Sequence, residues 1–378
     1  MQKILFLFLI FSTGAKAQHL AAFFDERNYF CVFDDGILRT LEHDTVINYQ
    51  TGSNFLAYIN PNNELVYYTQ GISTVIEDDK PNAFFVSQNY LAYKVGSELK
   101  ILDHGVMKTA TTKCESFALG DSLLAFIDKK DSTLKVYWNG EIKIIEKGAK
   151  KIAVSQLSVS QDLVAYLTLN KDLKIWWHGK SYFLSKDGQN SGFRIGTALV
   201  AFADQPTNEF NIFYKGEILK FPKLFPRTLK VNNNSVAYVD QNGHFDVFYN
   251  GETIMISTQE PFDFAALWDQ VSYIVDNEYR VFHKGKIYVL DDNPSGVYVL
   301  DQTSDLISKI PVGNAVLFYP RNSFIYYDRT GIQNIFYKGE IRKNTSWQTD
   351  EKLIGVDDLI VFTDAFGKIS IYYKGRKY

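Results

Sequence analysis

Cysteine and methionine are nearly absent from this sequence, and proline is scarce. Its 378 residues include 2 cysteines, 3 methionines and 9 prolines. The two thiols, Cys31 and Cys114, allow one disulfide at most, which excludes a small scaffold held together by disulfides. A chain of this length can bury a core without a disulfide. We therefore expect both cysteines to be ordinary buried residues, with a pair between them as the alternative.

Long apolar runs are also missing, apart from one near the N-terminus. Ile4 to Phe11 is unbroken apolar sequence, far shorter than the roughly 20 residues of a membrane-spanning helix. Lys3 precedes it, and Ala15-Lys16-Ala17 follows with the small-x-small pattern of a signal peptidase site. These features predict a signal peptide over residues 1–17 and a mature periplasmic or secreted chain that begins at Gln18; an uncleaved anchor is the alternative. No later segment approaches 18 apolar residues, so we expect no membrane span after cleavage.

Neither sign of charge dominates the chain. Without Lys3 and Lys16 of the signal segment, 38 basic residues face 43 acidic ones, a net charge of −5. The charges are well mixed and form no basic block. Nucleic acid and anionic membrane surfaces are therefore poor candidates as partners.

Motifs of common enzymes and metal sites are absent. The sequence has no G-x-S-x-G, H-E-x-x-H or C-x-x-C motif and no glycine-rich phosphate loop. We accordingly predict no catalytic residue, no metal and no cofactor. An enzyme stays open as an alternative, because a fold that carries its site on loops can assemble it from scattered residues.

Aromatic residues, by contrast, are abundant. Phe, Tyr and Trp make up 15% of the chain, and together with β-branched residues they favour strands. No long stretch has apolar residues at helical spacing. The sequence therefore predicts an all-β protein.

A short motif that ends in a turn glycine recurs along the whole chain. One copy, from Ser235 to Glu252, reads SVAYVDQNGHFDVFYNGE. The turn glycines are Gly36, Gly71, Gly105, Gly140, Gly179, Gly216, Gly251, Gly285, Gly339 and Gly375. Their intervals are 34 to 39 residues, except for one of 54. A second landmark, the alanine of an LAY-like element, keeps the same period from Ala57 to Ala237, so we infer about ten repeats of about 36 residues.

Each repeat is predicted to form four short strands joined by hairpins. In the repeat that begins near Thr228, the strands are TLKVNN, SVAYV, FDVFY and ETIMIS. Asn250-Gly251 between the last two is typical of a type I′ turn, whose central residues both have positive φ. The long interval, from Gly285 to Gly339, indicates an insertion, which we place at about 287–311 as an extra hairpin or loop.

Four hairpin-linked strands of this length resemble one blade of a β-propeller, and their order resembles that of WD-repeat proteins. The rhythm is visible in FRIGTA, LVAFADQ and NIFYKG, between Phe193 and Gly216. The repeats lack the Gly-His pair before the first strand and the Trp-Asp pair after the third. The resemblance therefore implies an architecture and carries no catalytic residue across.

Ten repeats can be arranged as one ring, as two tandem propellers or as an open superhelix. The absence of a Pro/Gly/Ser linker favours one ring, so we predict a β-propeller over residues 18–378. Its first blade, which begins at HLAAFF, should lack the innermost strand. Its last blade, which ends at YYKGRKY, should barely begin a fourth strand.

Most repeats carry an aromatic residue two positions before the turn glycine. These residues are Trp138, Trp177, Tyr214, Tyr249, Tyr337 and Tyr373, with His283 at the same position. A position that recurs in most blades favours packing between blades, with a ring of platforms for sugars or peptide side chains as the alternative. Trp176-Trp177-His178 is the densest cluster, and together with Trp138 it forms the predicted binding site.

An aspartate recurs after the second strand of the repeat. It occurs at Asp25, Asp128, Asp204, Asp240, Asp276, Asp328 and Asp364. Aspartate favours turns because its side chain accepts hydrogen bonds from nearby backbone N–H groups. A calcium site would need several carboxylates in one loop, and the nearest approaches are DKKDS (Asp128, Asp131) and the pair Asp291-Asp292. We therefore predict a structural role in turns.

The expected function is that of an exported, non-catalytic binding or scaffolding protein. Loops that differ among blades, on a rigid frame, can form an asymmetric binding patch. The expected partner is a protein or glycan ligand in the cell envelope or outside the cell. The alternative is an exported hydrolase or lyase acting on glycan or peptide, with carboxylates such as Asp204 or Asp240 at a channel mouth.

Overall fold

The computed structural model describes residues 20–52, 54–148, 157–205, 207–267, 269–291, 310–312, 315–317, 323–327, 333–337, 339–343, 360–363, 369–373 and 376–378. Within these ranges the chain forms antiparallel strands and one turn of 3-10 helix, Gly188–Asn190. No helix in the described part of the chain is long and apolar enough to cross a membrane. The prediction of an all-β protein is confirmed.

The first four sheets follow one another along the chain, and we number them as blades 1 to 4. Blade 1 consists of β1 (Leu20–Phe24), β2 (Phe30–Asp34) and β3 (Ile37–Glu42). Blade 2 consists of β4 (Asn48–Thr51), β5 (Phe55–Ile59), β6 (Leu65–Thr69) and β7 (Ile72–Glu77). Blade 3 consists of β8 (Ala83–Val86), β9 (Tyr90–Val95), β10 (Glu98–Asp103) and β11 (Val106–Thr111). Blade 4 consists of β12 (Cys114–Leu119), β13 (Leu123–Asp128), β14 (Thr133–Trp138) and β15 (Glu141–Lys147).

The next four blades have the same four-stranded order. Blade 5 consists of β16 (Leu157–Val159), β17 (Leu163–Leu167), β18 (Leu173–Trp177) and β19 (Lys180–Ser185). Blade 6 consists of β20 (Arg194–Ile195), β21 (Leu199–Asp204), β22 (Glu209–Tyr214) and β23 (Glu217–Leu224). Blade 7 consists of β24 (Thr228–Val231), β25 (Ser235–Val239), β26 (Phe245–Tyr249) and β27 (Glu252–Ser257). Blade 8 consists of β28 (Phe264–Leu267), β29 (Gln270–Val275), β30 (Glu278–His283) and β31 (Lys286–Asp291).

The last part of the chain forms shorter sheets. A two-stranded hairpin consists of β32 (Ile310–Val312) and β33 (Ala315–Leu317). Blade 9 consists of β34 (Ser323–Tyr327), β35 (Gln333–Tyr337) and β36 (Glu340–Lys343). Blade 10 consists of β37 (Ile360–Thr363), β38 (Ile369–Tyr373) and β39 (Arg376–Lys377).

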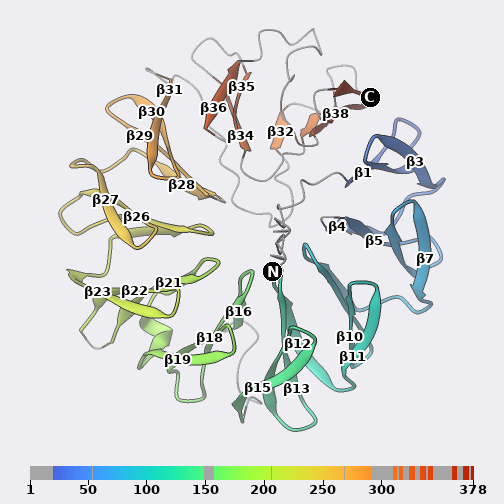
Figure 1. The fold of residues 1–378 in the computed structure, drawn as a ribbon, viewed down its shortest axis with the longest axis horizontal. Helices are drawn as coiled ribbons and strands as arrows, with labels where there is room; N and C mark the ends of the chain where they lie inside the picture. Colours follow the sequence, from blue (N-terminus) through green and yellow to red (C-terminus); the bar gives the residue numbers. More distant parts are fainter. Residues whose placement is uncertain are drawn as a thin grey trace, which may run out of the picture.

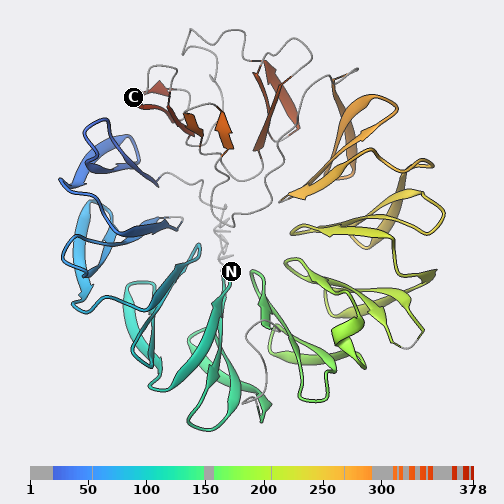
Figure 2. The same cartoon turned by 180° about the vertical axis from the view of Figure 1, so that it is seen from behind.

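The sheets stand side by side around a common axis, as the blades of a propeller do (Figure 1). The first strands, such as β4, β12 and β16, lie nearest the axis, and the fourth strands, such as β7 and β15, lie outermost. The view from behind shows the same single ring (Figure 2). The predicted β-propeller fold is thereby confirmed.

Local sequence explains the strands well. In blade 7 three of the four predicted segments coincide with β25 to β27, and the first, TLKVNN, extends two residues beyond the end of β24. The turn between β26 and β27 has φ angles of 51° at Asn250 and 91° at Gly251, as a type I′ turn requires. The hairpin register follows directly, because Tyr249 pairs with Glu252 across this two-residue turn.

The hydrophobic core is divided among the spaces between successive blades. One cluster joins Leu123 and Val136 of blade 4 to Val164 and Trp176 of blade 5. Both faces of a third strand are buried, since neighbouring residues on a strand face opposite sides of the sheet and both Ile175 and Trp176 are inaccessible. In the part of the chain that the structure describes, each of blades 1 to 8 is therefore held between two neighbours.

The ring closes by contact between blade 10 and blade 1. Ile371 and Tyr373 of β38 pack in one cluster with Phe33 of β2. The Tyr373 hydroxyl donates a hydrogen bond to Asp35 Oδ1 at 2.5 Å, and the Phe33 and Tyr373 rings lie 5.5 Å apart. Blade 1 has three strands and β39 has two residues, as predicted for the two ends of the chain.

Three predictions concern residues that are described only in part or not at all. The signal peptide over residues 1–17 lies outside the described residues. Of the predicted insertion at 287–311, residues 287–291 complete the fourth strand of blade 8, 310 and 311 belong to β32, and 292–309 lie outside the described residues. The projecting hairpin or loop stays a prediction.

Cys31 and Cys114 are both buried and unpaired. Burial raises the pKa of the Cys114 thiol to about 11, so the thiol stays protonated at neutral pH. Both are ordinary core residues, and the alternative of a disulfide between them is wrong.

Candidate functional site

One end of every blade carries the connections between first and second strands and between third and fourth strands; we call it the turn face. The third-to-fourth turn begins with a residue of positive φ even where that residue is not asparagine: φ is 49° at His104, 45° at His178 and 47° at Lys215. The glycine that follows each of them also has positive φ. The type I′ geometry therefore holds across blades, and it points the histidine side chains towards solvent, with 78% of His104 and 51% of His178 exposed.

All four residues of the predicted site come together at the turn face of blades 4 and 5. Trp176 is buried, and its ring meets Trp138 edge to face at 5.5 Å. The His178 ring stacks on Trp177 at 4.2 Å with an interplanar angle of 11°, and lies 6.3 Å from the Trp138 ring. His178 Nε2 is 2.6 Å from Asp162 Oδ2, which comes from the first-to-second connection of the same blade.

The indole rings of this cluster also serve a contact that recurs around the ring. The residue two positions before the turn glycine of one blade meets, edge to face, the residue three positions before the turn glycine of the next blade; we call this contact the seam. Aromatic seams have centroid distances of 5.3 to 6.0 Å and interplanar angles of 73° to 85°. The pairs are Trp138–Trp176, Trp177–Phe213, Tyr214–Phe248, Tyr249–Phe282, His283–Phe336 and Tyr373–Phe33. The packing interpretation of the recurrent aromatic residue is therefore correct, and of the predicted site residues His178 has the most exposed ring.

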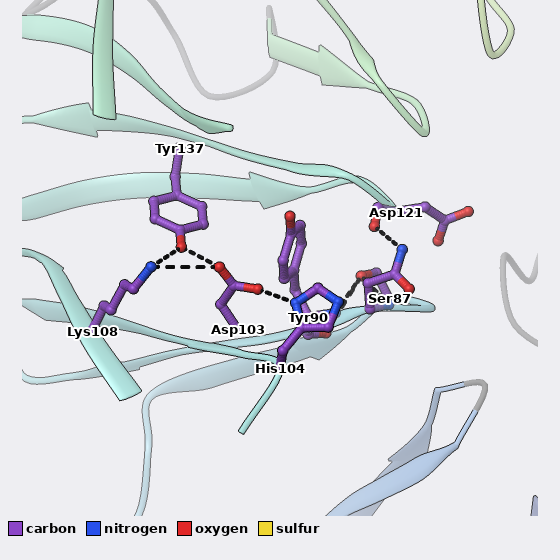
Figure 3. Close-up of polar contacts among 8 residues, drawn as sticks. Ser87, Tyr90, Asp103, His104, Lys108, Asp121 and Tyr137 are labelled. Atoms are coloured by element: carbon purple, nitrogen blue, oxygen red, sulfur yellow. Dashed lines mark hydrogen bonds and ion pairs between the residues drawn. The ribbon is translucent and has the colours of Figure 1, made fainter. Parts of the chain in front are cut away.

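Two seams are polar instead. Between blades 3 and 4, the Tyr137 hydroxyl donates to Asp103 Oδ2, and Lys108 Nζ donates to the Tyr137 oxygen at 2.7 Å (Figure 3). Between blades 1 and 2, Tyr68 donates to Asp34 at 2.9 Å and Arg39 stands in the place of the lysine. In each polar seam a carboxylate and a tyrosine occupy the positions of the aromatic pair, and a cation from the fourth strand bonds to the tyrosine.

The polar seam of blade 3 continues to the turn face. His104 Nδ1 lies 2.5 Å from Asp103 Oδ1, so the carboxylate joins His104 on one side and Tyr137 on the other (Figure 3). The His104 ring stands edge to face on Tyr90 at 6.3 Å. Nearby, Asp121 of blade 4 accepts hydrogen bonds from the connection of blade 3, for example from Gln88 N at 3.1 Å. These hydrogen bonds connect blades 3 and 4 at the turn face.

The electrostatics of this cluster hold each group in its usual charge state. Burial opposes ionisation of Asp103, but hydrogen bonds from Tyr137 and His104 outweigh it and lower the pKa of the carboxyl. The hydrogen bond to Tyr137 raises the pKa of Lys108, and burial raises the pKa of Tyr90 to about 12. No resolved pKa shift among the described residues moves a group towards neutral pH. A general acid or base works best with a pKa near the operating pH.

The recurrent aspartates organise turns. Asp240 Oδ1 accepts hydrogen bonds from Asn242 N at 2.8 Å and His244 N at 3.0 Å. Asp25 accepts two backbone N–H groups in the same way. Within the described residues, no group of three or more His, Cys, Asp or Glu side chains could hold a metal ion. Asp328 and Asp364 lie outside the described residues.

Sequence analysis missed an apolar surface on the outer strands. Exposed aliphatic, aromatic and methionine side chains recur on the fourth strands, which form the circumference of the ring; we call this surface the outer rim (Figure 1). Its members are Ile37, Leu38, Ile72, Val75, Val106, Met107, Ile142, Ile144, Phe183, Ile218, Leu224, Met255, Ile287, Val289 and Ile341. The signal was present in segments such as ETIMIS, where apolar residues occupy both faces of a strand that ends a repeat.

Comparison with known proteins gives one family match. The model of the 10-bladed beta propeller domain matches residues 14–304. No curated protein sequence matches the chain.

Among solved structures, the chain is similar to the computationally designed Ika8 protein, with 12% identity and a TM-score of 0.34 over 77% of this chain and 96% of that chain. It is similar to Prp20p from Saccharomyces cerevisiae, with 10% identity and a TM-score of 0.34 over 62% and 79% of the two chains. It is also similar to the CRINKLY WD40 ectodomain of the Arabidopsis thaliana receptor kinase ACR4, with 13% identity and a TM-score of 0.30 over 64% and 99%. TM-scores this low carry no argument about ligand or function.

Proposed function

This chain belongs to the 10-bladed beta propeller domain family, and we propose that it is an exported, non-catalytic scaffold that binds protein partners along its outer rim. The observation that carries the proposal is the exposed apolar surface of the fourth strands. An apolar patch that extends over several neighbouring elements marks an interaction site more often than scattered surface residues do.

The geometry of the rim favours an extended polypeptide as the partner. Each fourth strand is the last strand of its sheet, so its outer backbone edge pairs with no other strand of the described chain. A partner strand can add to such an edge through backbone hydrogen bonds, while apolar side chains give additional contact area. Ile72, which is 66% exposed on β7, is the most exposed large apolar residue of the rim.

The non-catalytic part of the proposal rests on the titratable groups. Asp240, one of the carboxylates considered for an enzyme, is occupied in a turn, and backbone hydrogen bonds from His244 and Asn242 outweigh burial and lower its pKa. Asp204 lies at the end of β21, where Ser185 Oγ donates to it at 3.4 Å. An acid–base pair needs groups of contrasting pKa within reach of one substrate. A hydrolase or lyase is therefore the alternative function, and it needs a separate test.

Export follows from the N-terminal sequence. Lys3, the apolar run Ile4 to Phe11 and the Ala15-Lys16-Ala17 site have the order of a secretory signal. Intact-mass measurement of protein exported by a native-like host should give a chain that begins at Gln18. A mass that retains residues 1–17 would contradict export by cleavage.

Site-specific photo-crosslinking tests the binding surface. A photoreactive phenylalanine analogue replaces Ile72 on the rim, and a second variant carries it at Asn62, which is exposed in a second-to-third connection. We expect a discrete crosslinked protein from the envelope fraction at position 72 and none at position 62. Identical products at both positions, or none at position 72, would refute binding through the rim.

The rival enzyme needs its own measurement. A panel of glycans and peptides is incubated with the mature chain, and products are followed by mass spectrometry. Turnover that is abolished by Asp240→Asn or Asp204→Asn would establish the enzyme and defeat the scaffold. Absence of turnover across the panel, together with the crosslink at position 72, supports the scaffold.

A further inference from the structure

A pocket is lined by residues of, or next to, the first strands of blades 5, 6 and 7. The first strands are the strands nearest the axis of the ring (Figure 1). Its volume is about 460 Å³, within the usual range for small-molecule sites. Its lining residues are Ser158, Gly192, Phe193, Arg194, Ile195 and Val231. The outer rim lies at the opposite edge of the same blades, so this pocket is separate from the proposed partner surface.

Arg194, which is exposed, supplies the pocket with one cation. Its Nη1 donates hydrogen bonds to the carbonyl oxygens of Phe193 at 2.9 Å and Gly192 at 3.3 Å. These two bonds hold the guanidinium against its own strand. The Nε and Nη2 donors have no partner among the described residues, and no described carboxylate lies within 4.0 Å of the group. The free Nε–Nη2 edge is the edge that forms two parallel hydrogen bonds with a carboxylate.

Three of the other five lining residues are apolar. Phe193 and Ile195 pack against the core cluster between blades 5 and 6, and Val231 packs against the cluster between blades 6 and 7. Core packing therefore restricts the positions of these three side chains. Ser158 adds one neutral hydroxyl from β16. Apolar side chains beside one cation suit a ligand with an apolar body and a single negative group.

We propose that this pocket binds a small organic carboxylate. The carboxylate pairs with the Nε–Nη2 edge of Arg194, and the apolar body lies against Phe193, Ile195 and Val231. A neutral ligand of the same shape leaves the guanidinium without an anionic partner. The site therefore discriminates by charge as well as by shape, independently of any protein that binds the outer rim.

Ligand-observed fluorine NMR on the mature full chain tests the pocket. The probe is 4-fluorophenylacetate, and 4-fluorophenylacetamide is its neutral counterpart of nearly equal size. We expect saturable line broadening of the carboxylate and roughly tenfold or weaker binding of the amide, because a hydrogen-bonded charge pair is lost.

Three variants identify the residue responsible. Arg194→Gln should weaken carboxylate binding by roughly tenfold or more. Arg194→Lys keeps the charge but loses the paired donors, so its affinity for the carboxylate should lie between those of the wild type and Arg194→Gln. The matched control Lys180→Gln removes a positive charge from an exposed position on β19 and should bind as the wild type does. Circular dichroism checks that each variant is folded. If Arg194→Gln does not fold, the binding of the carboxylate by Arg194→Lys decides whether Arg194 is responsible. No saturable binding by the wild type, equal binding of acid and amide, or unchanged binding by the folded Arg194 variants would overturn the proposal.

Discussion

The two seams of blade 4 join it to its neighbours through different kinds of contact. Towards blade 5, Trp138 and Trp176 meet edge to face in an apolar contact. Towards blade 3, Tyr137 bonds to Asp103 and Lys108. The aromatic seam is held by buried area and ring geometry, whereas the polar seam depends on every hydrogen bond being made. Equivalent positions in a repeat can therefore give the ring the same shape but a different sensitivity to substitution and pH.

The largest effect is expected from removing the aromatic ring at the centre of its seam. Trp176 is 2% exposed, so Trp176→Ala should lower the free energy of unfolding by about 3–5 kcal/mol, through lost burial and the cavity left behind. Urea unfolding followed by circular dichroism measures it. A loss below about 1 kcal/mol would mean that the seam contributes little to holding blades 4 and 5 together.

A smaller effect is expected from removing one hydroxyl at the polar seam. Tyr137→Phe leaves Asp103 without its tyrosine donor, and should cost about 1–3 kcal/mol because a partly buried carboxylate loses a partner. Tyr214→Phe is the matched control at an aromatic seam: among the described residues the Tyr214 hydroxyl bonds only to exposed Asn250, at 3.3 Å, so its loss should be within about 0.5 kcal/mol. Equal losses for the two variants would refute the distinction between the seams.

The free energy of unfolding should also depend on pH at the polar seam and not at the aromatic seam. The folded protein lowers the pKa of Asp103 below its ordinary value of 3.8. The stabilisation from this carboxylate is therefore complete above the unfolded value and is lost as the pH falls through the lower folded value. The stability difference between wild type and Asp103→Asn, measured by urea unfolding, should shrink between neutral pH and about pH 3. The difference between wild type and Tyr214→Phe should stay constant; a parallel change in both would place the effect elsewhere.

Local features could be predicted from the sequence because each depends on residues close together in the chain. The strands of blade 7, the I′ turn at Asn250-Gly251 and the truncated first blade are all set by patterns within a few residues. Seam partners in consecutive blades lie 33 to 53 residues apart in the sequence, and Tyr373 of the last blade reaches Asp35 across 338 residues. No local pattern specifies those contacts. The packing role of the aromatic position was inferred from its recurrence, but the polar alternative was not.

The sequence predicted which residues form the candidate site, but not the role of each residue. Trp138, Trp176, Trp177 and His178 do lie together, yet their separate roles depend on the neighbouring blade. Trp177 belongs to the predicted binding site, but it also belongs to a seam. Its ring contacts Phe213 of blade 6, so removing it would change the seam as well as the surface. The pocket at Arg194 draws on three blades, which explains why no motif revealed it.

The smallest effect on stability is expected at His178, and this makes it the cleanest probe of the turn face. Its side chain is 51% exposed, stacks on Trp177 and pairs with Asp162. His178→Ala should change the free energy of unfolding by no more than about 0.5 kcal/mol, since exposed contacts contribute little. If the cluster binds a sugar or peptide ring by stacking, the variant should weaken binding in a glycan and peptide array while leaving the crosslink at position 72 unchanged. Array binding that survives His178→Ala would refute stacking on the His178 ring as the basis of that binding.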